Sequence, residues 1–259
     1  MSFMTFSVER LEFYALIFIR VTMLIATAPI FNMNYMPRKF KTGICLFLSL
    51  VLFPLIPYSP LQYNGVIGYT MLVVREAMTG ALLGLASGLC MYILDFSGHL
   101  IDMEIGFSMV TLLDPATNTQ TSITGSFLGQ LVMLMLLVTD FHYFLIDTMV
   151  DSFSVIPLGG ANFSGKLYLI YADYMTNYFI IGFRIILPIF ASILVVNIVL
   201  GVLAKVAPQM NMFAIGMQLK VFVGLFIMTI LVTMLPGITD FLFIQMKTMT
   251  SSIVKALMP

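Results

Sequence analysis

The sequence predicts an all-α protein of hydrophobic helical hairpins that associates with a membrane. Of its 259 residues, 60% are hydrophobic and 9% are charged, and the mean hydropathy is +1.05. A soluble globular protein carries roughly 25% charged residues, so this chain has too few charges to cover the surface of a water-soluble domain. Its apolar runs of 16 to 29 residues are too long for strands and lack the alternation of a membrane β-barrel, so we expect helices.

The composition also excludes several functional classes. Lys and Arg together number 12, as do Asp and Glu, so no basic surface is expected that would bind nucleic acid. Cys45 and Cys90 each lie inside an apolar run, where we interpret them as small core residues rather than metal ligands or disulfide partners. We therefore expect no metal, no cofactor and no nucleic-acid partner.

Six apolar runs follow one another along the chain, separated by segments that contain Pro, Gly, Asn and charged residues. They cover residues 11–31, 42–57, 66–94, 123–150, 178–203 and 213–236. The first run resembles a secretory signal peptide, but Glu9, Glu12 and Arg20 interrupt that pattern. We expect it to be retained as the first helix.

The distribution of Lys and Arg does not fit six ordinary membrane spans. Such spans concentrate these residues on one side, whereas alternating the six runs places four on each side. The run 42–57 ends in Pro54 and Pro57 and is short for about 30 Å of hydrocarbon. We expect that some runs pack inside protein rather than cross a bilayer.

Charged residues inside apolar runs are the first candidate functional residues. Arg75 and Glu76 lie within 66–94, and Arg184 lies within 178–203. A charge that faces lipid at mid-helix is costly, so we expect all three to be buried against protein partners. Because adjacent residues on a helix point about 100° apart, Arg75 and Glu76 should contact different neighbours.

A stripe of small residues predicts close helix packing. Gly80, Gly84 and Gly88 recur at four-residue spacing on one helix face, and Gly125 and Gly129 begin another apolar run in the same way. Such spacing lets two helix backbones approach closely. The partner helix belongs either to the same chain or to another subunit, and the sequence leaves both alternatives open.

Two patterns that resemble enzyme motifs are interpreted as structural. Residues 160–166 match the first seven positions of a P-loop, but the eighth is neither Ser nor Thr and no strand precedes the segment. His99, Asp102 and Glu104 lack the two-histidine spacing of a zinc peptidase, and His142 has no nucleophile at a suitable spacing. We therefore expect no enzymatic activity.

The connection Gly106–Ser122 is unusual because it contains bulky hydrophobic residues and no Lys or Arg. Its candidate residues are Gly106, Phe107, Met109, Leu112, Leu113, Asp114 and Pro115. Surface loops normally lack such side chains, because exposing large apolar groups to water is unfavourable. We interpret the connection as a segment that folds into a structure such as a pore.

A polar corner between the last two apolar runs is interpreted as an interface. Its candidate residues are Asn197, Gly201, Lys205, Pro208, Gln209, Asn211, Phe213 and Gly216. Amides and lysines concentrated around a proline-broken connection fit contact with protein better than contact with lipid.

Taken in order along the chain, these stretches resemble the FliR family, core subunits of the export gate in bacterial flagellar type III secretion. The strongest similarity lies in residues 197–217, with the segments NIVLG and KVAPQMNMFAIGM. Further similar stretches cover residues 20–31, 37–54, 98–115 and 152–159. His99 and Glu104 depart from the family pattern, which carries amides there.

The resemblance implies a specific assembly. One copy of such a subunit joins FliP and FliQ subunits in a helical ring, and FlhB then contacts the ring. Residues 1–177 would resemble a FliP subunit, and residues 178–259 would resemble the helix pair of FliQ. The loop at Gly106–Ser122 would project into the channel as a plug. Unfolded flagellar proteins would pass through this channel at the bacterial inner membrane, in the flagellar basal body.

Three alternatives remain at this point. The related subunit of a virulence injectisome has a similar sequence pattern. A small-solute secondary transporter would use Arg75, Glu76 and Arg184 as charges near the middle of the membrane, although no internal symmetry is found. An intramembrane hydrolase would use His99, Asp102 and His142 but lacks a credible nucleophile.

Overall fold

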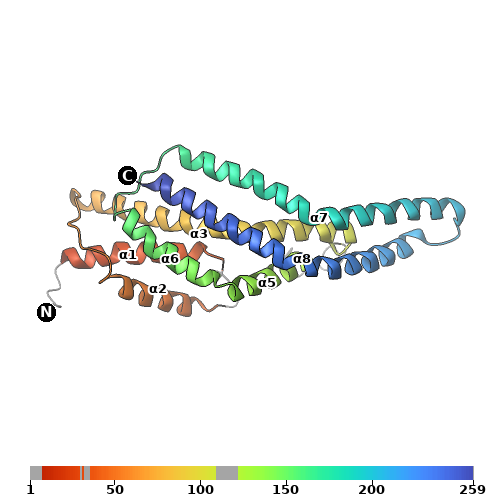
Figure 1. Cartoon of the computed structure of the whole chain (residues 1–259), viewed down its shortest axis with the longest axis horizontal. Helices are drawn as coiled ribbons and strands as arrows, with labels where there is room; N and C mark the ends of the chain where they lie inside the picture. Colours follow the sequence, from red (N-terminus) through yellow and green to blue (C-terminus); the bar gives the residue numbers. More distant parts are fainter. Residues whose placement is uncertain (1–7, 30, 32–35, 109–121, 259) are drawn as a thin grey trace. The chain divides into compact units, whose positions relative to one another are not determined.

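The computed structural model describes residues 8–29, 31, 36–108 and 122–258. All regular secondary structure in these ranges is helical, which confirms the predicted all-α class. The helices are α1 (Val8–Thr27), α2 (Arg38–Leu52), α3 (Gly65–Ile105), α5 (Ile123–Val138), α6 (Phe141–Val155), α7 (Lys166–Val206) and α8 (Met212–Leu257). Figure 1 follows them from α1 in red to α8 in blue.

The described chain forms two compact units, each assembled from separate stretches of sequence. Unit 1 comprises Met1–Leu89, Asp140–Tyr174 and Ile244–Pro259, and unit 2 comprises Cys90–Thr139 and Met175–Phe243. Each unit draws on both sides of the expected boundary at residues 177 and 178. The resemblance of residues 1–177 to FliP and of residues 178–259 to FliQ therefore stays a prediction, which the division into two compact units does not test.

In unit 1, α1 lies beside α2 (Figure 1). One face of α1 is buried through Ile17, Val21 and Leu24, which recur at the four- and three-residue spacing of a core-facing helix. Helix α2 contributes little to this core, because most of its side chains are exposed and only Cys45, Ser49 and Leu52 are buried. The short run 42–57 thus forms a peripheral helix in the single chain.

In unit 2, the end of α3 packs with α5 and with parts of α7 and α8. The fully buried side chains of unit 2 include Ile101, Ile105, Leu128, Val132, Leu136, Ile189 and Ile193. A close approach at Gly98 requires the absence of a side chain, because a Cβ there would collide with the backbone of Gly125 at the start of α5. Ser97 adds a hydrogen bond from its hydroxyl to the carbonyl of Gly182 on α7, at 3.1 Å.

The apolar run 123–150 forms two helices, not one continuous helix. Helix α5 ends at Val138 and α6 begins at Phe141, and Asp140 between them has φ of 60°. This left-handed conformation interrupts the helix, and Asp tolerates it better than most residues do. The hydrophobic periodicity alone did not reveal this break, because both helices are apolar.

Three described helices, α3, α7 and α8, are long and apolar enough to cross a membrane, or four segments if α5 and α6 count together as one broken span. Within their most hydropathic windows, 56% of α3 is buried, but only 28% of α7 and 22% of α8. At 1.5 Å per residue, the 41 residues of α7 and the 46 of α8 extend well beyond about 30 Å of hydrocarbon. These two helices therefore present large apolar surfaces for lipid or for other protein chains.

Candidate functional site

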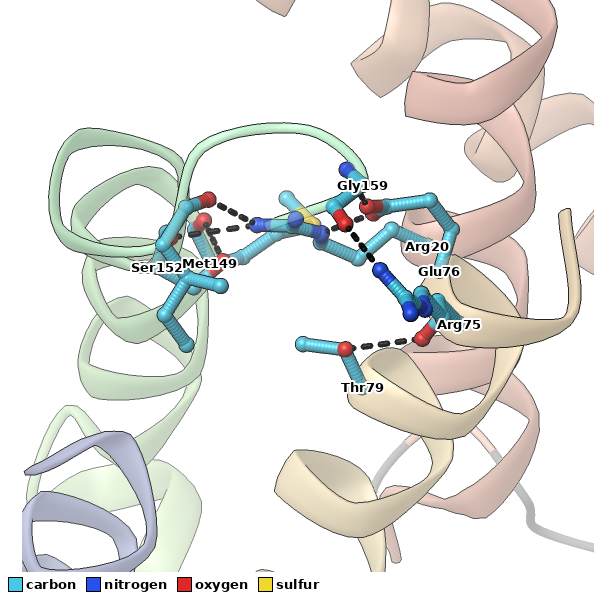
Figure 2. A network of polar contacts seen from close by, with 8 residues as sticks. Arg20, Arg75, Glu76, Thr79, Met149, Ser152 and Gly159 are labelled. Carbon is cyan, nitrogen blue, oxygen red and sulfur yellow. Dashed lines mark hydrogen bonds and ion pairs between the residues drawn. The ribbon is translucent and has the colours of Figure 1, made fainter. Parts of the chain in front are cut away.

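A buried ion pair between α1 and α3 organises the polar interior of unit 1 (Figure 2). Arg20 Nε donates to Glu76 Oε2 at 2.5 Å, and both side chains are fully buried. A buried charge is strongly unfavourable unless an opposite charge and further hydrogen bonds compensate for the lost water. The pair therefore fixes α1 against α3 at one axial position.

Glu76 also holds the turn that follows α6. Its Oε1 accepts a hydrogen bond from the backbone N of Gly159 at 2.7 Å, and the carbonyl of Gly159 accepts one from Arg75 Nη1 at 3.0 Å. Gly159 has φ of 75°, a conformation that residues with a side chain rarely adopt. The two adjacent charges on α3 thus contact opposite groups of the same glycine.

Arg20 also binds the end of α6. Its Nη1 donates to the carbonyls of Ser152 and Ile156 at 3.1 and 3.0 Å, and its guanidinium lies 4.4 Å from the centre of the Phe153 ring. Carbonyls at the C-terminal end of a helix carry partial negative charge, so a cation is favourable there. Arg20 therefore connects α1, α3 and α6.

The three charged residues that were predicted to be buried differ in their exposure in the single chain. Glu76 is fully buried, whereas Arg75 and Arg184 are exposed. Burial of the two arginines stays a prediction that concerns an assembly with other chains. Arg20, the partner of Glu76, was not among the selected charges. The available signal was the presence of opposite charges in two separate apolar runs, which can remain buried only if they meet.

The glycine stripe packs on α1 of the same chain. A Cβ on Gly80 would collide with the carbonyl of Arg20, and one on Gly84 would collide with the hydroxyl of Thr27 and the carbonyl of Leu24. Gly88 is also buried. Two of the three glycines thus have their partner within unit 1, the first of the two alternatives that the sequence left open.

In unit 2, Asp102 closes the base of the connection Gly106–Ser122. Its Oδ2 accepts hydrogen bonds at 2.7 Å from the Ser122 hydroxyl and from the backbone N of Ile123, and its Oδ1 accepts one from the N of Thr124 at 3.2 Å. Free backbone N–H groups at a helix N-terminus favour a carboxylate. The carboxylate on α3 therefore anchors the start of α5.

Both ends of the connection are held at this base. The carbonyl of Asp102 accepts hydrogen bonds from the backbone N of Gly106 at 3.0 Å and from the hydroxyl of Ser108 at 3.3 Å. Gly106 has φ of 99° and open space where a side chain would project. The predicted plug residues Met109, Leu112, Leu113, Asp114 and Pro115 lie outside the described residues.

The polar corner between α7 and α8 is exposed for most of its length. Gly201 has open space around it, and Asn211 Oδ1 accepts a hydrogen bond from the backbone N of Ala214 at 3.4 Å in the first turn of α8. Gly216 is buried, and a Cβ there would lie 3.1 Å from the side chain of Leu200 on α7. The exposed members are Asn197, Lys205, Pro208, Gln209, Asn211 and Phe213.

A cavity of about 330 Å³ is lined by residues of both this corner and the base of the connection Gly106–Ser122. Its walls include Gly106 from the loop base and Asn197, Phe213 and Gly216 from the corner. Glu104 and Lys220 also line it. Sequence reasoning selected the two regions separately, and the structure joins them within unit 2.

The enzyme-like residues form no catalytic arrangement among the described residues. His99 Nε2 lies 3.8 Å from a carboxylate oxygen of Asp95 at a half-exposed position on α3. Asp102 is occupied with the start of α5, and no group of three His, Cys, Asp or Glu side chains that could hold a metal is found in the described ranges.

Fold and site together define a hydrophobic, all-α membrane protein whose described buried polar groups hold its helices together. The family of bacterial export proteins, family 1, matches residues 11–246. The chain belongs to this family, and its membership supports a role in flagellar export.

Several curated relatives are similar along most of their length. Flagellar biosynthetic protein FliR of Bacillus subtilis is 32% identical over 84% of both chains. The FliR proteins of Pectobacterium carotovorum and Escherichia coli are 28% and 26% identical, over 93% and 92% of this chain and 92% and 91% of their own. The similarity therefore extends across both units.

Replacing Arg20 by Met should lower the free energy of unfolding by about 3–5 kcal/mol, because Glu76 would remain as an uncompensated buried charge. The double variant Arg20→Met, Glu76→Gln should recover part of this loss, since no unpaired charge remains. Both cysteines are free and buried, so a thiol-reactive dye reports unfolding of the detergent-solubilised chain on heating.

Arg75→Met is the matched control, because Arg75 is exposed and donates a hydrogen bond to the carbonyl of Gly159. Its melting temperature should fall much less than that of Arg20→Met. Equal losses for the two single variants would show that the buried pair does not organise unit 1.

Replacing Gly84 by Leu should prevent folding of unit 1 even when the chain is expressed alone, because the side chain would collide with α1. Gly129→Leu is the control, since Gly129 lies in a helix and has open space around it. Size-exclusion chromatography in detergent gives the folded fraction. Normal folding of Gly84→Leu would contradict close packing of α1 on α3.

Proposed function

We propose that the chain is a non-enzymatic core subunit of the flagellar protein export channel in the bacterial inner membrane. The observation that carries this proposal is the family match over residues 11–246, supported by relatives that are named flagellar biosynthetic proteins. The names of these relatives favour flagellar export over a virulence injectisome, and the family match disfavours a solute transporter or a hydrolase.

The proposed partners are FliP and FliQ subunits in a ring that contains one copy of this chain, with FlhB in contact with the ring. The large exposed apolar surfaces of α7 and α8 support association with other hydrophobic chains or with lipid. In this proposal, residues 1–177 occupy the position of a FliP-like subunit, and residues 178–259 occupy that of a FliQ-like helix pair.

The connection Gly106–Ser122 is proposed to close the channel until an unfolded substrate arrives. A pore wide enough for an unfolded chain would conduct ions, and each charge crossing gains about 2.3 kcal/mol per 100 mV of membrane potential. A hydrophobic constriction excludes water and ions without a covalent barrier. Phe107, Met109, Leu112 and Leu113 supply the hydrophobic side chains.

The hydrogen bonds that Asp102 makes to both ends of the connection, here called the Asp102 clamp, support this role. A plug must keep its place at the channel, which requires that both of its ends are fixed. Asp102 fixes both ends, through Gly106 and Ser108 on one side and Ser122 to Thr124 on the other. The proposed plug is therefore attached to a base that the rest of unit 2 holds in position.

Replacing Phe107, Met109, Leu112 and Leu113 by Ser should make cells that express the assembled complex leak small ions, because a polar constriction stays wet. Loop length and the Asp102 clamp are retained in this variant. The measurement is ion conductance of the inner membrane, together with recovery of the complex by affinity purification.

Replacing Asn118, Thr119 and Gln120 by Ser in the same connection is the matched control, since it keeps both loop length and polarity. The control should stay impermeable to ions. If the four-serine variant assembles normally and conductance is unchanged, the connection is not the seal.

A further inference from the structure

Helices α7 and α8 carry matched charge-free segments within unit 2. On α7, residues 185–204 contain no Asp, Glu, Lys or Arg and are bounded by Arg184 and Lys205. On α8, the corresponding charge-free segment is 221–239, bounded by Lys220 and Asp240. About 20 helical residues span the roughly 30 Å of a bilayer's hydrocarbon core. Arg184 therefore lies at the edge of a segment with the length of one membrane crossing.

A cavity of about 330 Å³ lies beside Arg184, between α7 and α8. Arg184 is the only charged residue in its lining, which otherwise consists of Ile181, Ile185, Pro188, Leu231, Met234, Gly237, Ile238 and Phe241. Gly237 leaves open space where a side chain would project. The volume falls at the lower end of the range of about 300–1,000 Å³ for ligand pockets.

The guanidinium of Arg184 has no partner within the described part of the chain. No hydrogen bond or ion pair joins it to another described residue, although Asp240 lies on the neighbouring helix. Asp240 is absent from the cavity lining. The cavity therefore combines an uncompensated positive charge with apolar walls.

This combination matches the chemistry of an anionic phospholipid. A guanidinium stays charged and binds phosphate through two parallel hydrogen bonds. Lipid phosphates lie where the hydrocarbon core ends, and an arginine at the end of an apolar helical segment extends its head group to that level. Acyl chains can fill the apolar part of the cavity, with the phosphate at Arg184.

We propose that the cavity between α7 and α8 is a binding site for one anionic phospholipid, with Arg184 as the phosphate ligand. Gly237, which leaves open space, and Pro188 line the apolar part of the cavity, where the acyl chains would lie between the helices. Such a site would exist whether or not the chain lines an export channel.

The test is native mass spectrometry of the full chain in detergent, titrated separately with phosphatidylglycerol and with phosphatidylcholine. The wild-type chain should bind one phosphatidylglycerol in preference to phosphatidylcholine. Arg184→Gln should weaken phosphatidylglycerol binding about tenfold, the loss expected for a charge-assisted hydrogen-bonded pair. Arg184→Lys should retain part of the preference, because it keeps the charge but not the paired hydrogen bonds.

Lys205→Gln is the matched control, since it removes one exposed positive charge from the same helix outside this cavity. It should leave the first phosphatidylglycerol bound as tightly as in the wild-type chain. An equal loss in Lys205→Gln and Arg184→Gln would show nonspecific attraction and overturn the proposal. A wild-type chain without preference for phosphatidylglycerol would overturn it too, and would leave a carboxylate from another chain as the partner of Arg184.

Discussion

The pairing of Arg20 with Glu76 is the constraint on which the rest of unit 1 depends. Neither charge reaches water, so each must be neutralised by the other and by backbone groups. This requirement sets the position of α1 along α3, which in turn brings the backbone of α1 against Gly80 and Gly84. Arg20 also binds the end of α6, and Glu76 binds the turn that follows α6. The same pair therefore positions α6.

The sequence predicted those features that depend on local pattern. Helices followed from apolar length, and Glu76 followed from the cost of a charge inside an apolar run. The partner of Glu76 did not, because Arg20 lies 56 residues away and pairing at that separation depends on tertiary packing. Asp102 was noted only as a polar residue, since its role depends on the start of a helix 21 residues later. The break at Asp140 was missed because apolar periodicity continues across it.

The buried polar groups have different roles in the two units. In unit 1 the buried charges of Arg20 and Glu76 hold helices together. In unit 2 the carboxylate of Asp102 holds the base of a hydrophobic connection. Unit 2 also contains most of the exposed large hydrophobic side chains of α7 and α8. A subunit with a rigid polar interior and large apolar outer surfaces is suited to permanent assembly in a membrane, where neighbouring chains and lipids cover those surfaces.

We propose that this chain works as one subunit of a larger export channel. The mass of the intact particle, extracted in mild detergent through a tag on this chain, tests this proposal. We expect a mass far above 28.9 kDa, made up of one copy of this chain and several copies of other hydrophobic subunits. A particle that contains only this chain and lipid, from cells that assemble flagella, would contradict it.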